Sequence, residues 1–560
     1  MASIVGKRIN GQTYYYLREV ARVGGRPKVV SQRYLGKAAD ITAAIDGAAT
    51  LPERTRHLGF GALAAAWSML AELDVAGSID WIVGRRRADA ALTVGTYIAL
   101  AAANRVVAPC SKLAFADWWQ TTAADRFIKV PLQALDHRRF WDAMDQLTPA
   151  QTARIERMVV ARMVQRFGLD LQGLVVDMTN FATFIDSANQ RAPIAQRGKA
   201  KQKRVDLRLV GLGLVVTRDG GVPICSHPYP GDRPDVTQFT ALVDELVARF
   251  GALGMAPGAL TVVYDAGCDS ADNQDRLEAL GLHYVGSLRP SDHPDLLAVA
   301  ASRFQVVDAT RFGGLTAFET HAAALGADRR VIVTHSPTFH QRQAQGFAQT
   351  LAKARRQLGE LQARLARGHT RRARIQVEAH IARILAPRWL DRVVAWELTG
   401  DRPASLRLHW RTDQAARRRL EREVFGKRIL FTDHDWPVAE VVAAYRAQAD
   451  VEAGFRQLKD PKVVSFSPMF HWTEQKIRVH VLYCVLALMV AHLLRRQAAR
   501  AGIAMSVREL LATLDGIQET VMVYPSTGGR PRARRMLTEL TPTAARLYDL
   551  FGLAAWAPPG

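Results

Sequence analysis

Cysteine is scarce in this sequence, with 4 in 560 residues. The four are scattered and form no CxxC pair, so neither a disulfide framework nor a structural zinc site is expected. The longest apolar run, 481–494, has about 14 residues, fewer than the roughly 18 to 20 of a membrane-spanning helix, and predicts a buried core helix. An apolar signal-peptide core and a GxxxxGK phosphate loop are also missing. We therefore expect a cytoplasmic protein that is neither bound to a membrane nor driven by ATP.

Acidic residues are in deficit as well. The 53 Asp and Glu face 75 Lys and Arg, which gives a net charge of +22 and a pI near 10.3. Such a surface favours a polyanionic partner, and the lack of a membrane segment makes nucleic acid the first choice. A coding bias toward arginine explains the same excess, so the charge alone leaves DNA binding open. The length is sufficient for about two to four packed domains.

In the first third of the chain, the spacing of apolar residues changes once, from the alternation of strands to the spacing of helices. Residues 1–50 alternate in the manner of strands, with turn signals at 9–11 and 24–25, and predict a small β-meander. Residues 51–168 carry apolar side chains at helical spacing and predict a helical domain. This domain serves either to bind specific DNA ends or to support a catalytic core, and the sequence favours neither role.

Residues 169–300 predict a mixed sheet with helices on its faces. The apolar strand 174–177 ends on Asp177, and a second apolar strand, 260–265, ends on Asp265. Functional groups collect at strand ends in such sheets, so these two aspartates form a candidate site. Each is, taken alone, also an ordinary strand-end residue.

Residues 301–433 interrupt the sheet pattern and predict an insertion domain. Apolar residues between 347 and 365 follow a heptad spacing, which predicts the first helix of a hairpin. The second helix bears three isoleucines, Ile375, Ile381 and Ile384, and short strands follow it. The arginines along the hairpin either follow DNA phosphates or form a solvated helix face.

Glu452 is the candidate for a third acid. It lies in the segment 434–500, which we expect to form a second part of the core. A C-terminal helical tail, 501–560, follows this segment and is a candidate for dimerisation. Phosphoryl transfer by two metal ions requires carboxylates from several chain positions around cations about 3.5–4 Å apart. Glu452 shares a helical face with Tyr445, Gln448, Arg456 and Lys459. The alternative is an exposed helix in which Glu452 pairs with Arg456.

The residues around Glu452 resemble the YREK signature, Tyr-x2-Arg-x3-Glu-x6-Lys, of bacterial DDE transposases of the "insertion sequence four" superfamily. Tyr445, Glu452 and Lys459 fall at the signature's spacings, and Gln448 stands where the signature has Arg. Four further blocks are similar to the family's conserved segments in the same order, namely 174–181, 197–216, 230–239 and 262–273. The resemblance covers nearly the whole chain.

The resemblance implies an α/β multidomain protein with a ribonuclease-H-like mixed-sheet core, interrupted by the insertion domain and preceded by the β-meander and the helical region. It implies a catalytic triad that binds metal ions, formed by Asp177, Asp265 and Glu452. The triad would hold two Mg²⁺ ions, and Mn²⁺ would substitute for them. We also expect four residues of the signature helix to bind DNA phosphates: Tyr445, Gln448, Arg456 and Lys459.

The implied activity is cut-and-paste transposition of an insertion sequence. The partners are then double-stranded DNA, both as terminal inverted repeats and as target, and further copies of the chain in a homodimer or larger homo-oligomer. The implied location is the nucleoid-associated cytoplasm of a bacterium. In relatives an aromatic residue of the insertion stacks a flipped base; Trp396, Trp410 and Trp436 are candidates, and each is also typical of a buried core.

Two rival functions remain. A catalytically silent or domesticated DNA-binding relative would keep the basic surface without turnover; the three retained acids argue against it and Gln448 argues for it. A two-metal nuclease without strand transfer would use the same acids. His434, between two aspartates, lacks zinc-ligand spacing with cysteines and is interpreted as a turn residue.

Overall fold

The computed structural model divides the chain into two compact units. The first comprises Met1–Ser68, Ala116–Val130 and Arg508–Gly560, and the second comprises Met69–Phe115 and Pro131–Val507. The described residues are 2–23, 26–49, 51–84, 91–198, 206–369, 371–525 and 532–559. The expected turn at 24–25 and most of the basic part of the block 197–216 lie outside them.

Three antiparallel strands open the first unit, in the order β1-β2-β3. They are β1 (Ala2–Ile9), β2 (Gln12–Val23) and β3 (Arg26–Gly36), and helix α1 (Ala38–Ala49) follows. The sequence placed a turn at 9–11, and Asn10 and Gly11 there have φ values of 49° and 80°. This left-handed region favours Asn and Gly, which explains the sequence signal.

A second sheet of the first unit joins distant parts of the chain. Its order is β17-β16-β4, with β4 (Arg54–Gly59), β16 (Gln518–Tyr524) and β17 (Arg532–Leu537). The segment 501–560 therefore contains two strands besides α17 (Val507–Asp515) and α18 (Pro542–Leu550), where the sequence predicted helix alone. The buried Glu519 of β16 accepts from Arg126 at 2.9 Å and pairs with Arg535 at 2.7 Å, contacts that no local pattern reveals.

Helices occupy most of the region from residue 61 to residue 167. They are α2 (Gly61–Glu72), α3 (Val75–Val83), α4 (Val94–Val107), α5 (Phe115–Gln120), α6 (His137–Asp145) and α7 (Pro149–Phe167). The boundaries of α7 follow from its sequence. Thr148 and Gln151 form a capping box at its start, and Gly168 ends it with a φ of 55°.

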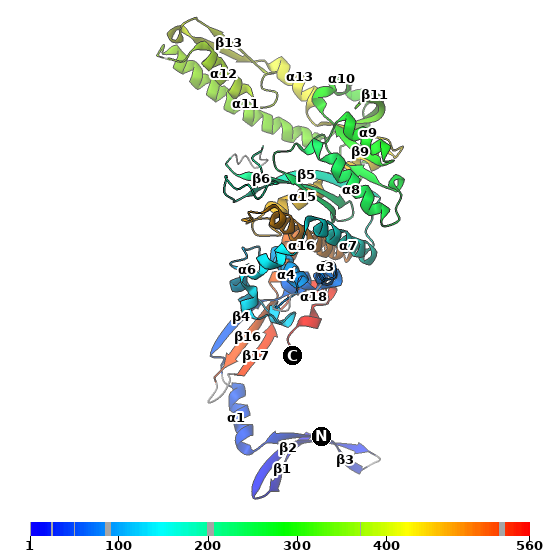
Figure 1. Ribbon diagram of the computed structural model, residues 1–560, viewed down its shortest axis with the longest axis vertical. Helices are drawn as coiled ribbons and strands as arrows, with labels where there is room; N and C mark the ends of the chain where they lie inside the picture. The colour runs from blue at the N-terminus through cyan, green and yellow to red at the C-terminus, as the bar shows by residue number, and fades with distance from the viewer. Residues whose placement is uncertain are drawn as a thin grey trace. The chain divides into compact units, whose positions relative to one another are not determined.

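A nine-stranded mixed sheet forms the centre of the second unit (Figure 1). Its order is β10-β11-β12-β15-β9-β8-β5-β6-β7. The parallel strands are β5 (Gly173–Thr183), β8 (Thr261–Val263) and β9 (His283–Leu288). The antiparallel strands are β6 (Arg208–Thr217), β7 (Pro223–Pro230), β10 (Gln305–Val306), β11 (Thr316–Ala324), β12 (Ala327–His335) and β15 (Lys427–Thr432). The predicted mixed α/β sheet is confirmed.

The sheet extends into the region 301–433 that the sequence assigned to an insertion. Strands β10, β11, β12 and β15 all belong to it, and the segment outside the sheet runs only from about 337 to 424. Val331, Ile332 and Val333 of β12 are all 0% exposed, so this strand is covered on both faces. The sequence did not predict this strand, because three charged residues, 328–330, directly precede its apolar residues.

The segment between β12 and β15 begins with a helical hairpin, α11 (Pro337–Ala366) and α12 (Arg374–Leu385), as predicted. The residues at heptad spacing on α11 are all buried: Phe347, Leu351, Ala354, Leu358, Leu361 and Leu365. On α12, Ile381 and Ile384 are buried, whereas Ile375 in the first turn is 74% exposed. Strands β13 (Val394–Thr399) and β14 (Arg407–Thr412) and helix α13 (Gln414–Val424) complete the segment.

The remaining helices cover the sheet. They are α8 (Phe239–Gly251), α9 (Ala271–Ala279), α10 (Pro294–Leu297), α14 (Val438–Arg446), α15 (Gln448–Lys459) and α16 (Glu474–Arg500). By length and composition α16 is able to cross a membrane, but 94% of its apolar window is buried inside the protein. It packs against α4 and α7, which fits the predicted core helix.

Candidate active site

The register of the sheet aligns Asp177 with Asp265. In the parallel pair β5–β8, Val175 lies opposite Val263, and two further residues along each chain lead to the two aspartates. Asp177 is half-buried and Asp265 is exposed. The acids thus occupy corresponding positions along two adjacent chain segments, Asp177 within β5 and Asp265 just beyond the end of the short strand β8.

The predicted end of the first strand at Asp177 is wrong. Strand β5 continues to Thr183, because Asp177 pairs with Leu214 and the ladder to β6 runs on to the last residue of β5. The position of Asp265 is nearer to the prediction, two residues beyond the end of β8. Asp177 therefore lies in the middle of a strand that is fixed by β6 on one side.

Local backbone groups orient both carboxylates. Asp177 Oδ1 accepts a hydrogen bond from the backbone N–H of Met178 at 2.7 Å, and Asp265 Oδ1 accepts one from the N–H of Gly267 at 2.9 Å. A Cβ atom on Gly267 would lie 2.9 Å from that oxygen, so glycine permits the tight turn in the Asp-x-Gly segment.

Helix α15 is attached to β5 by both of its ends and to β8 by its first residue. Gln448, at the first position, donates from Nε2 to the carbonyl oxygens of Val176 at 3.4 Å and Val263 at 3.2 Å. Lys459, at the last position, donates from Nζ to Thr179 Oγ1 at 2.5 Å. These contacts hold one face of the helix against the strands that carry the aspartates.

Glu452 lies on that face. It follows Gln448 by four residues and precedes Lys459 by seven, and both spacings return to the same side of a helix. Its side chain is exposed, and among the described residues it forms no ion pair with Arg456. The alternative, an exposed helix in which Glu452 forms an ion pair with Arg456, is therefore not what the structure shows. The sequence treated 445–460 as one helix, whereas α14 ends at Arg446 and α15 begins at Gln448.

Of the four expected phosphate-binding residues, two are buried. Tyr445 is 8% exposed; its hydroxyl donates to Ser287 Oγ at 2.9 Å and accepts from Arg428 at 3.2 Å. Ser287 in turn accepts from the N–H of Ala266, so Tyr445 supports the turn after Asp265. Gln448 is also 8% exposed. Arg456 is exposed and Lys459 half-buried.

Acidic groups crowd the centre of the site. Burial raises the pKa of the Cys268 thiol well above its usual range, and the nearby charges of Asp265, Asp177, Asp235 and Asp269 raise it further. Burial also raises the pKa of Asp269 to about 7; Arg289 opposes the shift and Asp265 adds to it. Crowded carboxylates repel one another unless cations neutralise them, and carboxylate oxygens are the ligands that Mg²⁺ prefers. Asp177, Asp265 and Glu452 are carboxylates of this kind; in the described part of the chain, their oxygens do not all lie within 4.8 Å of one another.

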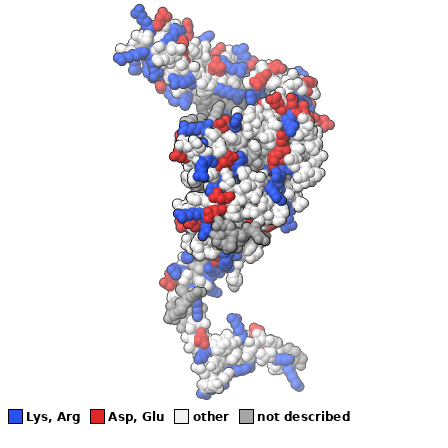
Figure 2. All heavy atoms as spheres, viewed as in Figure 1, with Lys and Arg blue, Asp and Glu red and all other residues white. Residues whose placement is uncertain are grey.

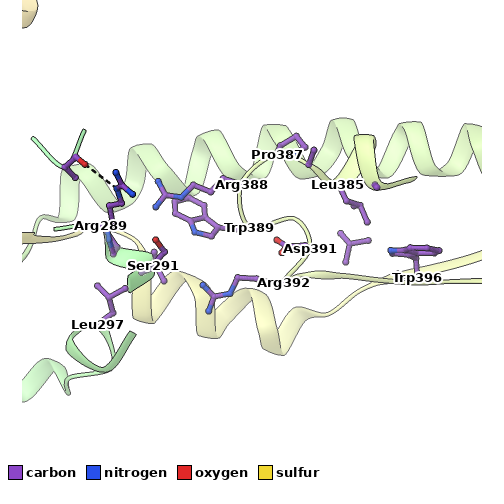
Figure 3. A pocket seen from close by; sticks show the side chains of 16 residues that line it. Arg289, Ser291, Leu297, Leu385, Pro387, Arg388, Trp389, Asp391, Arg392 and Trp396 are labelled. Atoms are coloured by element: carbon purple, nitrogen blue, oxygen red, sulfur yellow. Dashed lines mark hydrogen bonds between the residues drawn. The ribbon is translucent and has the colours of Figure 1, made fainter. Parts of the chain in front are cut away.

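A cavity of about 950 Å³ opens beside Asp265, between the core and the inserted segment. Its lining includes Ala266, Arg289, Arg388, Trp389, Arg392 and Trp396. Figure 3 shows Trp389 between the Arg388 and Arg392 side chains. Arg289 Nε donates a hydrogen bond to the carbonyl oxygen of Ala266. Trp389 has a φ of 71°, a strained conformation for a bulky residue of the kind that collects at functional sites.

Sequence reasoning missed Trp389. The segment 388–392 places a tryptophan between two arginines, a pattern typical of nucleic-acid binding that could have identified it. Of the three tryptophans it named, Trp396 lines the cavity and Trp410 is its cross-strand partner. Trp436 instead stacks on His434, with 3.7 Å between ring centroids.

A second cluster lies at the opposite end of β8, which begins at Thr261. His283, Asp433 and His434 have potential ligand atoms within 4.8 Å of one another. His283 Nδ1 lies 2.8 Å from Asp433 Oδ2, and His434 Nε2 lies 2.9 Å from Thr261 Oγ1. The two imidazole rings stack at 28° rather than converge on a point, so this cluster closes one end of the sheet by its own hydrogen bonds.

The comparison with protein families decides the class of the chain. A family model described as "Transposase DDE domain" matches residues 169–489, more than half of the 560 residues. The chain belongs to this family. The match includes Asp177, Asp265 and Glu452, and it makes the chain a DDE transposase, an enzyme class that cleaves and joins DNA with divalent metal ions.

The other comparisons give less. No curated protein matches the chain. Among solved structures, a cryo-EM structure of a piggyBac transposase synaptic complex with hairpin DNA is similar over 83% of this chain and 82% of the other, with 10% sequence identity and a TM-score of 0.37.

Proposed function

We propose that this transposase excises and inserts its element by a cut-and-paste mechanism, with Asp177, Asp265 and Glu452 holding two Mg²⁺ ions. The observation that carries the proposal is the attachment of α15 to both aspartate-bearing strands through Gln448. This contact ties the helix that carries Glu452, from a distant part of the sequence, to the strands that carry or precede the two aspartates.

The strand order supports a ribonuclease-H-like core. Strands β7, β6 and β5 form an antiparallel ladder, and β8 and β9 continue it in parallel to β5. This five-stranded arrangement has one acid in its central strand, β5, and one just after the next parallel strand, β8. The segment 337–424 then serves as the insertion before the glutamate, as in the "insertion sequence four" superfamily.

Divalent ions bound here would supply activation of water or a 3′ hydroxyl and stabilisation of the leaving oxygen in an in-line transfer. Residues of the chain hold the carboxylates in position for this reaction. The N–H groups of Met178 and Gly267 fix the two aspartates, and Gln448 and Tyr445 hold the surrounding helix and turn. Because Gln448 serves the fold in this way, its departure from the signature does not favour a silent enzyme.

The cavity beside Asp265 suits a DNA strand. Arg289, Arg388 and Arg392 offer cations to phosphates, and Trp389 offers a ring on which a displaced base can stack. We propose that Arg456, which is exposed on α15, binds a phosphate, together with the half-buried Lys459 at the end of the same helix. Lys and Arg side chains are spread over the inserted segment in Figure 2, with Asp and Glu side chains among them, and we propose that these cations contact double-stranded DNA outside the cavity.

The partners and the location follow the same proposal. The substrates are the terminal inverted repeats and the target DNA, and the active form is a homodimer or larger assembly in the bacterial cytoplasm. The helical region 51–168 is proposed to recognise the DNA ends.

The test is excision from a plasmid in which the element's inverted repeats flank a marker, in Mg²⁺ or Mn²⁺. We expect excision and joining to a second plasmid by the wild type, and loss of both in Asp177→Ala, Asp265→Ala and Glu452→Ala. Asp328→Ala is the matched control, because the side chain of Asp328 is 71% exposed and lies on β12 away from the site. Excision that survives the three site substitutions would overturn the proposal, and cleavage without joining would favour the nuclease.

A further inference from the structure

Asp235 is a fourth acid near the site. It lies in a short 3-10 turn, Asp235–Thr237, between β7 and α8. The block 230–239 was recognised in the sequence, yet none of its residues received a role.

Tyr229 connects Asp235 to the central strand β5. It lies opposite Gly211 of β6, and a Cβ atom on Gly211 would be 2.1 Å from the Tyr229 ring. The missing side chain lets the buried ring cross β6, so the hydroxyl reaches within 3.5 Å of the carbonyl oxygen of Thr179. The hydroxyl has one proton, and it donates this proton to Asp235 Oδ1 at 2.6 Å, a short charge-assisted bond.

Asn273 connects the same turn to the chain that follows Asp265. Its side-chain amide donates to the carbonyl oxygen of Val236 at 3.0 Å and to that of Cys268 at 2.8 Å. Asn273 is 5% exposed, so both bonds are shielded from water. The turn that carries Asp235 is thus fixed to the Asp265 turn through Asn273, and Tyr229, whose hydroxyl lies 3.5 Å from the carbonyl oxygen of Thr179, places it beside β5.

The electrostatic surroundings agree with this geometry. Besides burial, the charges that raise the pKa of Cys268 include those of Asp265, Asp177 and Asp235 together. Burial raises the pKa of Tyr229, and Asp235 and Asp177 raise it further. A buried thiol and a buried phenol therefore both sense Asp235 and Asp177 at once.

We propose that Asp235 is a positioning residue of the catalytic centre, a fourth carboxylate whose charge strengthens the binding of the divalent cations. The inference rests on the proposed function of Asp177, Asp265 and Glu452. Three carboxylates leave one positive charge of two divalent ions unbalanced, and Asp235 balances it before DNA arrives. Its contribution is therefore greatest in the protein without DNA, since a DNA phosphate brings negative charge of its own.

The test measures the binding of Mn²⁺ to the full chain without DNA, by electron paramagnetic resonance of the free ion. Asp235→Asn keeps the shape and the acceptor for Tyr229 but removes the charge. Removal of a residue that supports metal ligands typically weakens metal affinity about 10- to 100-fold, and we expect a loss in this range. Tyr229→Phe, which removes the hydrogen bond to Asp235 and keeps its charge, should give a smaller loss. Asp232→Asn is the matched control, because Asp232 is exposed in the same loop.

Cleavage of inverted-repeat DNA at varied Mg²⁺ provides the second measurement. Asp235→Asn should raise the Mg²⁺ concentration for half-maximal rate while the rate at saturating Mg²⁺ stays near that of the wild type. Wild-type Mn²⁺ affinity in Asp235→Asn, with or without a lower melting temperature, would overturn the inference. In that case Asp177→Ala still separates the two claims: its inactivity leaves the proposed function standing, and its full activity removes the function as well.

Discussion

Gln448→Ala tests whether this residue holds α15 or binds DNA. The substitution removes two hydrogen bonds, to the carbonyl oxygens of Val176 and Val263. Each such bond contributes about 0.5–1.5 kcal/mol, so we expect the free energy of unfolding to fall by about 1–3 kcal/mol. Gln448→Glu should cost more, because a carboxylate cannot donate and would face two carbonyl oxygens.

The assay combines urea unfolding, DNA affinity and the cleavage rate. We expect Gln448→Ala to lose stability and cleavage rate, since Glu452 one turn away loses its anchor, and to keep its affinity for inverted-repeat DNA. Arg456→Ala is the comparison, because this exposed residue of the same helix should do the reverse. Unchanged stability with weaker DNA binding in Gln448→Ala would refute the positioning role and restore the phosphate contact that the signature implied.

Three further predictions concern packing, DNA and pH. Gly211→Ala should destabilise the fold by about 1–3 kcal/mol in thermal unfolding, because the new methyl group displaces the Tyr229 ring. Trp389→Ala should lower the cleavage rate about 5- to 150-fold, the value of one stacked base, whereas Trp436→Ala should leave DNA binding unchanged in a mobility-shift assay. The raised pKa of Asp269, about 7, means that the folded state holds this proton more tightly than the unfolded chain. Stability in EDTA should therefore fall as pH rises from about 4 through 7, and Asp269→Asn should remove this part of the slope in urea titrations at several pH values.

The sequence predicted the parts of the site that depend on local pattern. Apolar residues before Asp177 and Asp265 mark the two strands, and the spacing around Glu452 marks one helix face. It failed where the position of a residue depends on distant chain. The continuation of β5 beyond Asp177 comes from pairing with β6, because residues 178–183 mix polar and apolar side chains without the regular alternation that predicts a strand.

The same reason explains the errors in organisation. Strand β16 exists because it pairs with β4, more than 450 residues earlier in the sequence. Gln448 looked like a weakened phosphate contact because the sequence gives no sign that its amide reaches two strands. Asp235 received no role because its link to the site runs through Tyr229 and the gap over Gly211, which are visible only in three dimensions.

The most direct test of the account is to map where a metal ion sits. Fe²⁺ in place of Mg²⁺, with ascorbate and peroxide, cuts the polypeptide close to the bound ion, and mass spectrometry locates the cuts. We predict cuts near Asp177, Asp265 and Glu452 in the same preparation, all lost in Asp177→Ala and all suppressed by excess Mg²⁺. Cuts confined to the neighbourhood of His283 and Asp433, or cuts at the three acids that persist in Asp177→Ala, would contradict a shared metal site.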